Sequence, residues 1–270
     1  KENRTRTIVR GSEDLDEAVG EGSGSKIRHR FSRQMETYSP PKYNRMNYEV
    51  KRIKNDEIKE WLLHKHYLKR ICSVTFAYGL FEENILVGIC TFGNAVPLQM
   101  KKSICGEKYM NIVYELNRLC INEELPKNTA SFFVSSCIKK LPKPTIIVSY
   151  ADKSIGHTGY VYQACNFYFT GESHTQKDWV LKGSEHLHSR TLMDEFPFQE
   201  NRVEKLKQKY GSDLYQIERP PKNRYVLFWG TRKQKNQIKK NKLFESKPYP
   251  KDINTRYDAS YKVTIQQRLF

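Results

Sequence analysis

Between residues 46 and 181 the chain carries a series of short apolar runs, each separated from the next by turn residues or by an amphipathic segment. Runs of this length that are rich in β-branched and aromatic residues are typical of strands. The predicted strands are 48–53, 73–80, 85–92, 111–122, 145–150, 167–171 and 178–181, and the predicted helices are 55–62, 129–140 and 159–166. This order predicts an α+β or α/β domain with a mixed, mainly antiparallel central sheet flanked by helices.

Three segments differ in composition. Residues 1–45 are rich in Gly, Ser, Pro and charge, which predicts a flexible linker because such a segment buries too little apolar surface to offset its chain entropy. Residues 46–200 hold the predicted catalytic domain. Residues 201–270 are predicted to form a basic extension with a short helix at 201–217 and a strand at 224–229.

The net charge of +17 is distributed unevenly along the chain. Residues 201–270 contain eighteen Lys and Arg residues but only six Asp and Glu residues. A local excess of cations attracts polyanions, since each neutralised phosphate releases counterions. Nucleic acid is therefore the expected partner. An anionic membrane is the alternative, but no basic helix has a clear apolar face, so no membrane partner is predicted.

Cysteine spacing and hydropathy bear on the cellular compartment. The six cysteines form no CxxC pair and several lie inside apolar runs, which predicts buried free thiols in a reducing cytoplasm. Metal-ligand spacing such as HExxH is absent from the sequence, so no metal site is predicted. We see no signal peptide and no apolar run of about 18 residues, and we expect a soluble cytoplasmic protein.

Two polar stretches interrupt the apolar pattern in the first half of the chain. His64 and His66 lie at the end of the first predicted helix, where solvated cations near the helix C-terminus are the simpler interpretation. In the predicted strand 111–122, Glu115 and Asn117 share one face and Arg118 lies on the other. These residues form either a structural ion pair or the floor of an active site.

The most informative stretch is YADKSIGHTGYVYQACNF, which begins at Tyr150. A carboxylate, Asp152, ends a buried strand, and ligands of open α/β sheets bind at the carboxyl ends of strands. Asp152 and His157 are suited to act as a base and its orienting partner, with Tyr160 or Tyr162 as proton donor. The alternative is an aspartate that caps a glycine turn.

The basic tail combines cations with aromatic residues. Trp229, Phe244 and Tyr249 are interleaved with the cations, and stacking aromatics beside cations suit a nucleic-acid surface. A solvated basic helix is the alternative. The predicted DNA-binding residues are Arg232, Lys233, Lys235, Lys239, Lys240 and Lys242.

Taken in order, these motifs resemble the phage Mom family of DNA-modification proteins, relatives of the N-acetyltransferase (GNAT) superfamily. The likeness covers residues 46–195. It rests on His66-Tyr67, on a hairpin that ends in GICTFG, on ELNRL from Glu115, on PKNTASF and on the stretch around Asp152. The tail motifs NRYVLFWGTRKQKN and KPYPK are similar to phage relatives as well.

The resemblance implies an acyltransferase-like enzyme that adds a small carbamoyl or acyl group to the N6 amine of adenine in double-stranded DNA. It would act in the host cytoplasm during phage infection and protect phage DNA from restriction. The implied catalytic residues are Asp152 as proton acceptor, His66 or His157 as proton shuttle, and Tyr160 or Tyr162 as donor. Implied contacts to substrate or to a small-molecule group donor are Tyr67, Arg70, Glu115, Asn117, Arg118, Ser131 and Gln163.

One departure from the superfamily concerns the group donor. Acetyltransferases of this fold carry a glycine-rich loop whose amides bind the CoA pyrophosphate. Here the position reads INEELPKNTASFF, without glycine. The identity of the donor therefore stays open. Two other functions remain as alternatives, namely a conventional acyl-CoA-dependent N-acetyltransferase and a non-catalytic DNA-binding protein.

Overall fold

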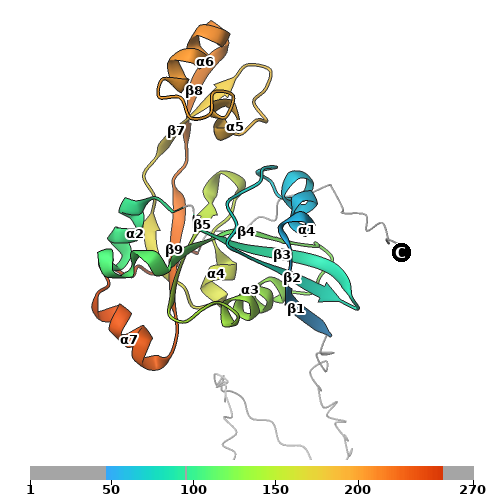
Figure 1. Cartoon of the computed structure of the whole chain (residues 1–270), viewed down its shortest axis with the longest axis vertical. Helices are drawn as coiled ribbons and strands as arrows, with labels where there is room; N and C mark the ends of the chain where they lie inside the picture. Colours follow the sequence, from blue (N-terminus) through green and yellow to red (C-terminus); the bar gives the residue numbers. More distant parts are fainter. Residues whose placement is uncertain (1–46, 95, 252–270) are drawn as a thin grey trace, which may run out of the picture. The chain divides into compact units, whose positions relative to one another are not determined.

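The computed structural model describes residues 47–94 and 96–251 (Figure 1). The predicted linker 1–45 lies outside these residues. The strands are β1 (Tyr48–Arg52), β2 (Phe76–Glu82), β3 (Ile85–Gly93), β4 (Val113–Ile121), β5 (Thr145–Asp152), β6 (Tyr168–Glu172), β7 (Gln176–Leu181), β8 (Leu214–Arg219) and β9 (Lys222–Trp229). The α-helices are α1 (Asn55–Glu60), α2 (Leu98–Cys105), α3 (Thr129–Lys139), α4 (Tyr160–Ala164), α5 (Ser189–Met193), α6 (Arg202–Tyr210) and α7 (Arg232–Lys240).

A seven-stranded sheet forms the centre of the fold. Its strand order is β1-β2-β3-β4-β5-β9-β6, and every pair is antiparallel except β4–β5. The predicted α+β class with a mixed, mainly antiparallel sheet is confirmed. The parallel pair is short, because Val113–Glu115 face 146–148 and no later residue of β4 pairs with β5. The two strands therefore separate towards their carboxyl ends.

The predicted hairpin at 82–84 is confirmed as the connection between β2 and β3. Glu83 and Asn84 form a two-residue turn, and both have positive φ values, 49° and 68°. This is the conformation of a type I′ turn, whose twist matches that of the flanking strands.

Helices cover both faces of the sheet (Figure 1). On one face, α3 buries Phe133, Val134 and Cys137 against side chains of β2, β3 and β4. On the other face, α1 packs over β2 and β3, while α2 and α7 pack over β5 and β9. Both faces are thus shielded from water. No helix within the described ranges is long and apolar enough to cross a membrane.

A β-bulge interrupts β4 beside the parallel pair. Thr91 faces Arg118 and Phe92 faces Leu116, so Asn117 has no partner across the strand pair. One extra residue reverses the alternation of faces. The predicted alternation of faces from Glu115 through Asn117 to Leu119 is therefore wrong.

Two strands behave differently from their predicted roles. Residues 178–181, predicted to close the sheet, belong to β7, which pairs only with β8 in a separate two-stranded sheet. β9 lies in the segment predicted as a basic extension, yet it is hydrogen-bonded between β5 and β6. The central sheet therefore extends past residue 200. Long-range pairing of this kind leaves no local sequence signal.

Residues 176–219, here called the insert, form a small unit between β6 and β9. Leu192, Leu206 and Leu214 are buried together, and Trp179, Phe196 and other apolar residues of the insert pack around them. The insert contains α5 and α6 between β7 and β8 (Figure 1). It thus has an apolar core of its own.

We predict that Leu206→Ala will loosen the insert selectively. The substitution leaves a cavity in a small core and should lower local stability by about 2–4 kcal/mol. Hydrogen exchange should accelerate in β7 and β8 while β3, β5 and β9 keep their protection. Leu80→Ala in the central core is the matched control and should weaken protection throughout the sheet. Equal opening of the central sheet by Leu206→Ala would contradict an independent insert core.

Candidate active site

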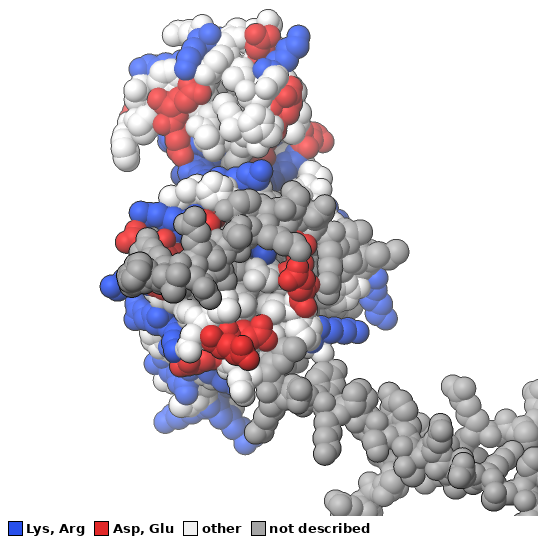
Figure 2. All heavy atoms as spheres, turned by 90° about the vertical axis from the view of Figure 1, so that its right-hand side faces the viewer, with Lys and Arg blue, Asp and Glu red and all other residues white. Residues whose placement is uncertain are grey.

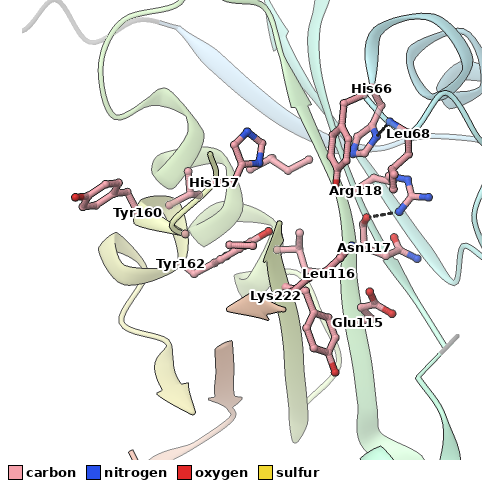
Figure 3. A pocket seen from close by; sticks show the side chains of 16 residues that line it. His66, Leu68, Glu115, Leu116, Asn117, Arg118, His157, Tyr160, Tyr162 and Lys222 are labelled. Carbon is pink, nitrogen blue, oxygen red and sulfur yellow. Dashed lines mark hydrogen bonds between the residues drawn. The ribbon is translucent and has the colours of Figure 1, made fainter. Parts of the chain in front are cut away.

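A cavity of about 230 Å³ lies where β4 and β5 separate (Figure 3). Beyond Glu115, β4 no longer pairs with β5, and residues of both strands line the cavity instead. The predicted site residues that line it are His66, Tyr67, Glu115, Asn117, Arg118, His157, Tyr160 and Tyr162. Segments far apart in the chain therefore meet at this cavity.

His66 is a neutral hydrogen-bond donor in this cavity. It is 4% exposed, and burial together with the charges of Arg118 and Lys222 lowers its pKa to about 3. Its Nδ1 accepts a hydrogen bond of 3.1 Å from the main-chain N–H of Leu68. Since Nδ1 is an acceptor, the ring proton lies on Nε2. His66 can therefore donate to a ligand from Nε2, and it is not poised to take a proton.

The cavity also holds tyrosines that stay protonated. Burial raises the pKa of Tyr162 to about 12, and its hydroxyl is hydrogen-bonded to Ser149. Burial, reinforced by the charge of Asp152, raises the pKa of Tyr67 far above its ordinary value. The Tyr67 ring stacks on His66 at 4.5 Å between centroids and contacts His157 edge-on at 6.0 Å. Tyr160, at the edge, is 40% exposed.

Arg118 brings a cation with an unused donor to the cavity. Its Nη1 donates to the carbonyl of Asn117 at 2.7 Å, whereas its Nε is buried and has no acceptor among the described residues. An unsatisfied buried donor costs about 1–3 kcal/mol. Because this Nε is also covered from the cavity, Arg118 can meet a ligand only through its other guanidinium nitrogens.

Glu115 is the carboxylate of the cavity. Burial raises its pKa, although the charges of Arg118 and Lys222 act in the opposite direction. No hydrogen bond or ion pair joins this carboxylate to the part of the chain that the structure describes. Its oxygens are consequently available to accept a proton or a hydrogen bond from a ligand.

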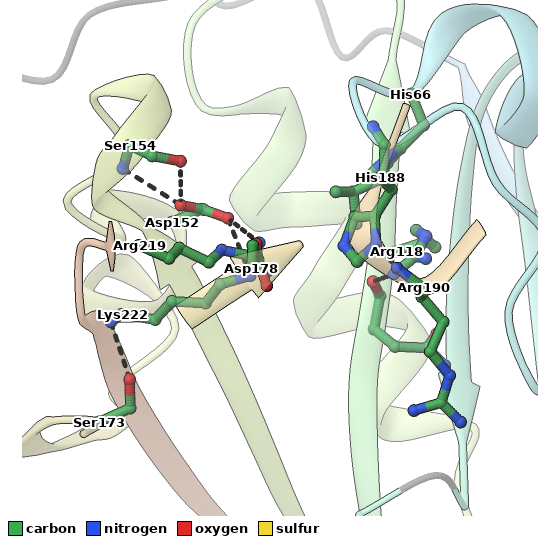
Figure 4. A network of polar contacts seen from close by, with 12 residues as sticks. His66, Arg118, Asp152, Ser154, Ser173, Asp178, His188, Arg190, Arg219 and Lys222 are labelled. Carbon is green, nitrogen blue, oxygen red and sulfur yellow. Dashed lines mark hydrogen bonds and ion pairs between the residues drawn. The ribbon is translucent and has the colours of Figure 1, made fainter. Parts of the chain in front are cut away.

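Asp152 lies beside the cavity and is fully engaged (Figure 4). Its Oδ2 accepts from Arg219 at 3.0 Å and Lys222 at 2.8 Å, and its Oδ1 accepts from the N–H and hydroxyl of Ser154. Burial disfavours the charged form of this 1% exposed residue, but these donors and cations outweigh burial and hold its pKa far below the ordinary range. Asp152 is thus a permanent anion whose two oxygens are both occupied.

The turn after Asp152 places His157 in the cavity. The His157 N–H donates to the carbonyl of Asp152 at 3.0 Å, and the Tyr225 hydroxyl donates to the carbonyl of Thr158 at 2.7 Å. Gly159 has φ of 99°, and a Cβ there would lie 2.4 Å from the Tyr225 ring. Only glycine fits this position. Burial lowers the pKa of His157, against the pull of Asp152, so its imidazole is neutral.

Asn117 has a structural environment although it lines the cavity. Its Nδ2 donates to the carbonyl of Ser73 at 2.8 Å, and its Oδ1 accepts from Thr91 at 2.6 Å. A Cβ at Gly93 would lie only 2.1 Å from the Ser73 carbonyl oxygen. The bulge residue therefore fastens the segment before β2 to β3 and β4.

A second cavity of about 600 Å³ adjoins the first, and both are bordered by Leu119, His157, Tyr160 and Val161. Ser131 and Gln163 line this second cavity, not the first. The Ser131 hydroxyl donates to the carbonyl of Asn128, and Gln163 Nε2 donates to the Tyr225 hydroxyl. The two cavities together provide room for two ligands side by side.

The loop that leads into α3 does not fit a CoA pyrophosphate. The N–H of Thr129 already donates to the carbonyl of Pro126, and the Thr129 side chain is buried. The loop also holds two acidic residues, Glu123 and Glu124, and no glycine. Open main-chain donors and glycine are what a phosphate-binding loop requires. The loop therefore lacks the features that would bind the pyrophosphate of CoA.

The remaining predicted residues lie away from the cavity. Arg70 forms an ion pair of 2.6 Å with Asp194 of the insert. The predicted DNA-binding cations lie on or just after α7, where Lys239 and Lys242 lie over the Tyr168 ring. α7 follows Trp229, whereas Lys222, at the other end of β9, lines the cavity. The seven residue steps from Lys222 to Trp229 place the two ends of β9 about 23 Å apart.

Our sequence prediction missed Arg219 and Lys222, the partners of Asp152. They flank Pro220-Pro221, and two prolines between cations were the available signal. Arg219 also pairs with Asp178 at 3.3 Å, so the ends of both insert strands meet at this cluster. His188 of the insert lies close enough to Arg219, Asp178 and Lys222 for their charges to act on its pKa, which burial lowers.

We predict that His66 contributes to loss of stability in mild acid. The folded-state pKa of about 3 lies below the unfolded value of 6.5, so only the unfolded chain takes up the proton as the pH falls. Between pH 7 and pH 5 this should remove about 2 kcal/mol of unfolding free energy. Chemical denaturation of His66→Gln should show a pH dependence weaker by that amount. His64→Gln is the control and should behave like the wild type. If the free energy of unfolding changes equally with pH in the wild type and in both variants, His66 is not a buried neutral residue.

The comparisons with known proteins agree on one family. Residues 47–251 match the model of the Mom protein family. A protein of Escherichia phage Mu named methylcarbamoylase mom is 28% identical over 221 residues, which cover 76% of this chain and 87% of that protein.

The solved structures that the chain resembles are acetyltransferases. A GNAT-family acetyltransferase from Bacillus cereus is 12% identical and matches 68% of this chain and 99% of its own, with a TM-score of 0.36. An N-acetyltransferase from Staphylococcus aureus is also 12% identical, with coverages of 67% and 98% and a TM-score of 0.37. Because the family model spans the whole described part of the structure, both cavities included, the chain belongs to the Mom protein family.

Proposed function

We propose that this protein is a phage DNA-modification enzyme that transfers a small carbamoyl-containing group to the N6 amine of adenine. The observation that carries the proposal is the cavity between β4 and β5, where an unpartnered carboxylate lies beside an unsatisfied arginine and neutral donors. The name of the phage Mu relative, methylcarbamoylase, supports the type of group. Protection of phage DNA from restriction in the host cytoplasm would follow from such a modification.

An adenine amine needs help to react. Its lone pair is delocalised into the ring, and the base must leave the duplex to reach an enclosed site, at a cost of a few kcal/mol. The first cavity, lined by aromatic rings and hydrogen-bonding groups, suits a flipped base. We propose that adenine occupies it and that the group donor occupies the adjoining cavity near Ser131 and Gln163.

Glu115 is our candidate for the proton acceptor. As N6 forms a bond to the carbon of the donor, one N6 proton passes to the Glu115 carboxylate. The sequence assigned this role to Asp152, but both oxygens of Asp152 already accept hydrogen bonds and its pKa is far too low. We propose that Asp152 instead positions Lys222 and the His157 turn. His157, a neutral imidazole shared by both cavities, is suited to relay the proton onward.

The donor side of the reaction develops negative charge. The Nε2 of His66 and the terminal guanidinium nitrogens of Arg118 are the donors suited to a carbonyl oxygen. The protonated Tyr162 is suited to give its proton to the leaving group as the bond between that group and the donor carbon breaks. Preorganised donors of this kind are worth about 2.7–4 kcal/mol each when they face developing charge in a dry site. Tyr67 stacks on His66 and holds its ring in place.

Cations would hold the DNA. We propose that α7 and its predicted DNA-binding residues Arg232, Lys233, Lys235, Lys239, Lys240 and Lys242 contact phosphates. α7 follows the Trp229 end of β9 and the cavity lies at its Lys222 end, so a bound duplex would have to extend along this strand to contact both.

The proposed function predicts a heavier adenosine in DNA from cells that express the whole chain. Mass spectrometry of plasmid nucleosides should show this species, and the added mass would identify the transferred group. Arg118→Ala should reduce it by at least about tenfold. An unmodified plasmid in the presence of a folded, DNA-binding protein would refute the proposed reaction. Acetylation of proteins or small molecules by purified enzyme would point to a conventional acetyltransferase instead.

Glu115→Gln and Asp152→Asn separate the two carboxylates. Glu115→Gln should lower the modification rate by about 10²–10⁴-fold. In the wild type the rate should rise with pH, with a midpoint above the usual carboxylate range because burial raises the pKa of Glu115. This rise should be absent from Glu115→Gln. Its unfolding free energy should not fall. Asp152→Asn leaves Lys222 without its partner carboxylate and Arg219 with Asp178 alone, and it should lower the free energy of unfolding by about 2–4 kcal/mol. Normal activity in Glu115→Gln would show that another residue accepts the N6 proton.

A further inference from the structure

Phe198, in the loop between α5 and α6, is displayed in an unusual way. It is 101% exposed, whereas the other exposed large apolar residues of the described chain range from 39% to 64%. Its φ is 60°, a left-handed conformation that is uncommon for a bulky residue. Such a conformation costs about 1–3 kcal/mol and persists only where the surroundings impose it. A fully exposed aromatic ring in a strained loop gains nothing for the fold by itself.

The loop around Phe198 is held on both sides. Phe196 packs against the leucine core of the insert, and Lys205 of α6 lies over the Phe196 ring at 5.9 Å. The same ammonium group donates to the side chain of Gln199. These contacts fix the residues next to Phe198 while its own ring points into solvent. The ring is therefore presented by a supported loop.

The loop is also tied to the edge of the active-site cavity. Asp194, four residues before Phe198, forms the 2.6 Å ion pair with Arg70. Arg70 lies four residues after His66, which lines the cavity. The ion pair therefore ties the start of the loop that carries Phe198 to the chain segment that carries His66.

We propose that Phe198 is a wedge that enters the base stack of duplex DNA while the target adenine occupies the cavity. This proposal rests on the proposed function, because flipping a base leaves a gap that must be filled or closed. Apolar side chains that insert between base steps are a recurrent device of proteins that distort the duplex. An aromatic ring is suited to this position, since stacking on a base is worth about 1–3 kcal/mol whatever the base.

The charges of the insert are compatible with this role. Figure 2 shows Lys and Arg side chains next to Asp and Glu side chains over the lobe at the top of the view, which contains α5 and α6. Asp194 and Glu195, which precede the loop, are neutralised by Arg70 and Lys209. The insert therefore does not need to supply the main attraction for DNA, and Phe198 can act by stacking alone.

Permanganate oxidation of unstacked thymines tests the wedge without requiring turnover. The probe is a linear DNA fragment from a plasmid that the wild-type protein modifies, bound to the full chain at equal occupancy for every variant. Wild-type protein should expose thymines opposite flipped adenines. Phe198→Ala should reduce their oxidation at least tenfold, and Phe198→Trp should stay within about twofold of wild type.

Two further variants separate a functional role from a structural one. Phe198→Gly should lose the thymine signal yet raise Tm by about 2 °C, because glycine accepts positive φ without strain. Leu98→Ala, which removes an exposed side chain outside the insert, should leave the signal unchanged.

Each opposing result has a distinct meaning. Undiminished oxidation with Phe198→Ala overturns the wedge. It is also overturned if the wild type sediments as a dimer that Phe198→Ala dissociates, because a second copy would then cover the ring. A wild-type protein that modifies no DNA in cells refutes the proposed function instead.

Discussion

The buried carboxylate of Asp152 holds together segments that lie far apart in the sequence. It ends β5, binds the start of the following turn through Ser154, and holds Lys222 at the start of β9 and Arg219 at the end of β8. One anion thus joins the central sheet, the turn that carries His157 and the point where the insert leaves the sheet. Its burial would be costly without these partners, and only the removal of both Arg219 and Lys222 would leave the buried anion without a cation.

The active-site cavity follows from a short parallel pair. β4 and β5 share three residue pairs and then separate, so polar groups from both strands face a space instead of each other. Burial there acts in the same way on three kinds of group. It keeps His66 and the tyrosines neutral, it raises the pKa of Glu115, and it leaves Arg118 Nε without an acceptor. A ligand with a carbonyl oxygen and an amine would match the Nε2 donor of His66 and the carboxylate of Glu115.

The insert is tied to the edge of the candidate active site, so in the proposed function it would link DNA contact to the cavity. Its strands start and end at the Asp152 cluster, its α5 side is tied to Arg70, and its loop displays Phe198. DNA that contacts the loop would therefore push on elements that also hold the cavity in shape. The small leucine core keeps the loop supported while the insert remains separate from the central core.

The fold class, the β2–β3 hairpin and α3 could be predicted from the sequence, because strand length, turn chemistry and helical periodicity are local properties. The ordered motifs, including the stretch from Asp152 to Tyr162, also indicated the family. The entry of β9 into the sheet, the departure of β7 from it and the reversal of faces at Asn117 of β4 emerge only from long-range strand pairing. The roles of Asp152 and Glu115 likewise depend on which cations the fold brings near each carboxylate. Local sequence cannot encode that proximity, since Arg219 and Lys222 are about 70 residues from Asp152 along the chain.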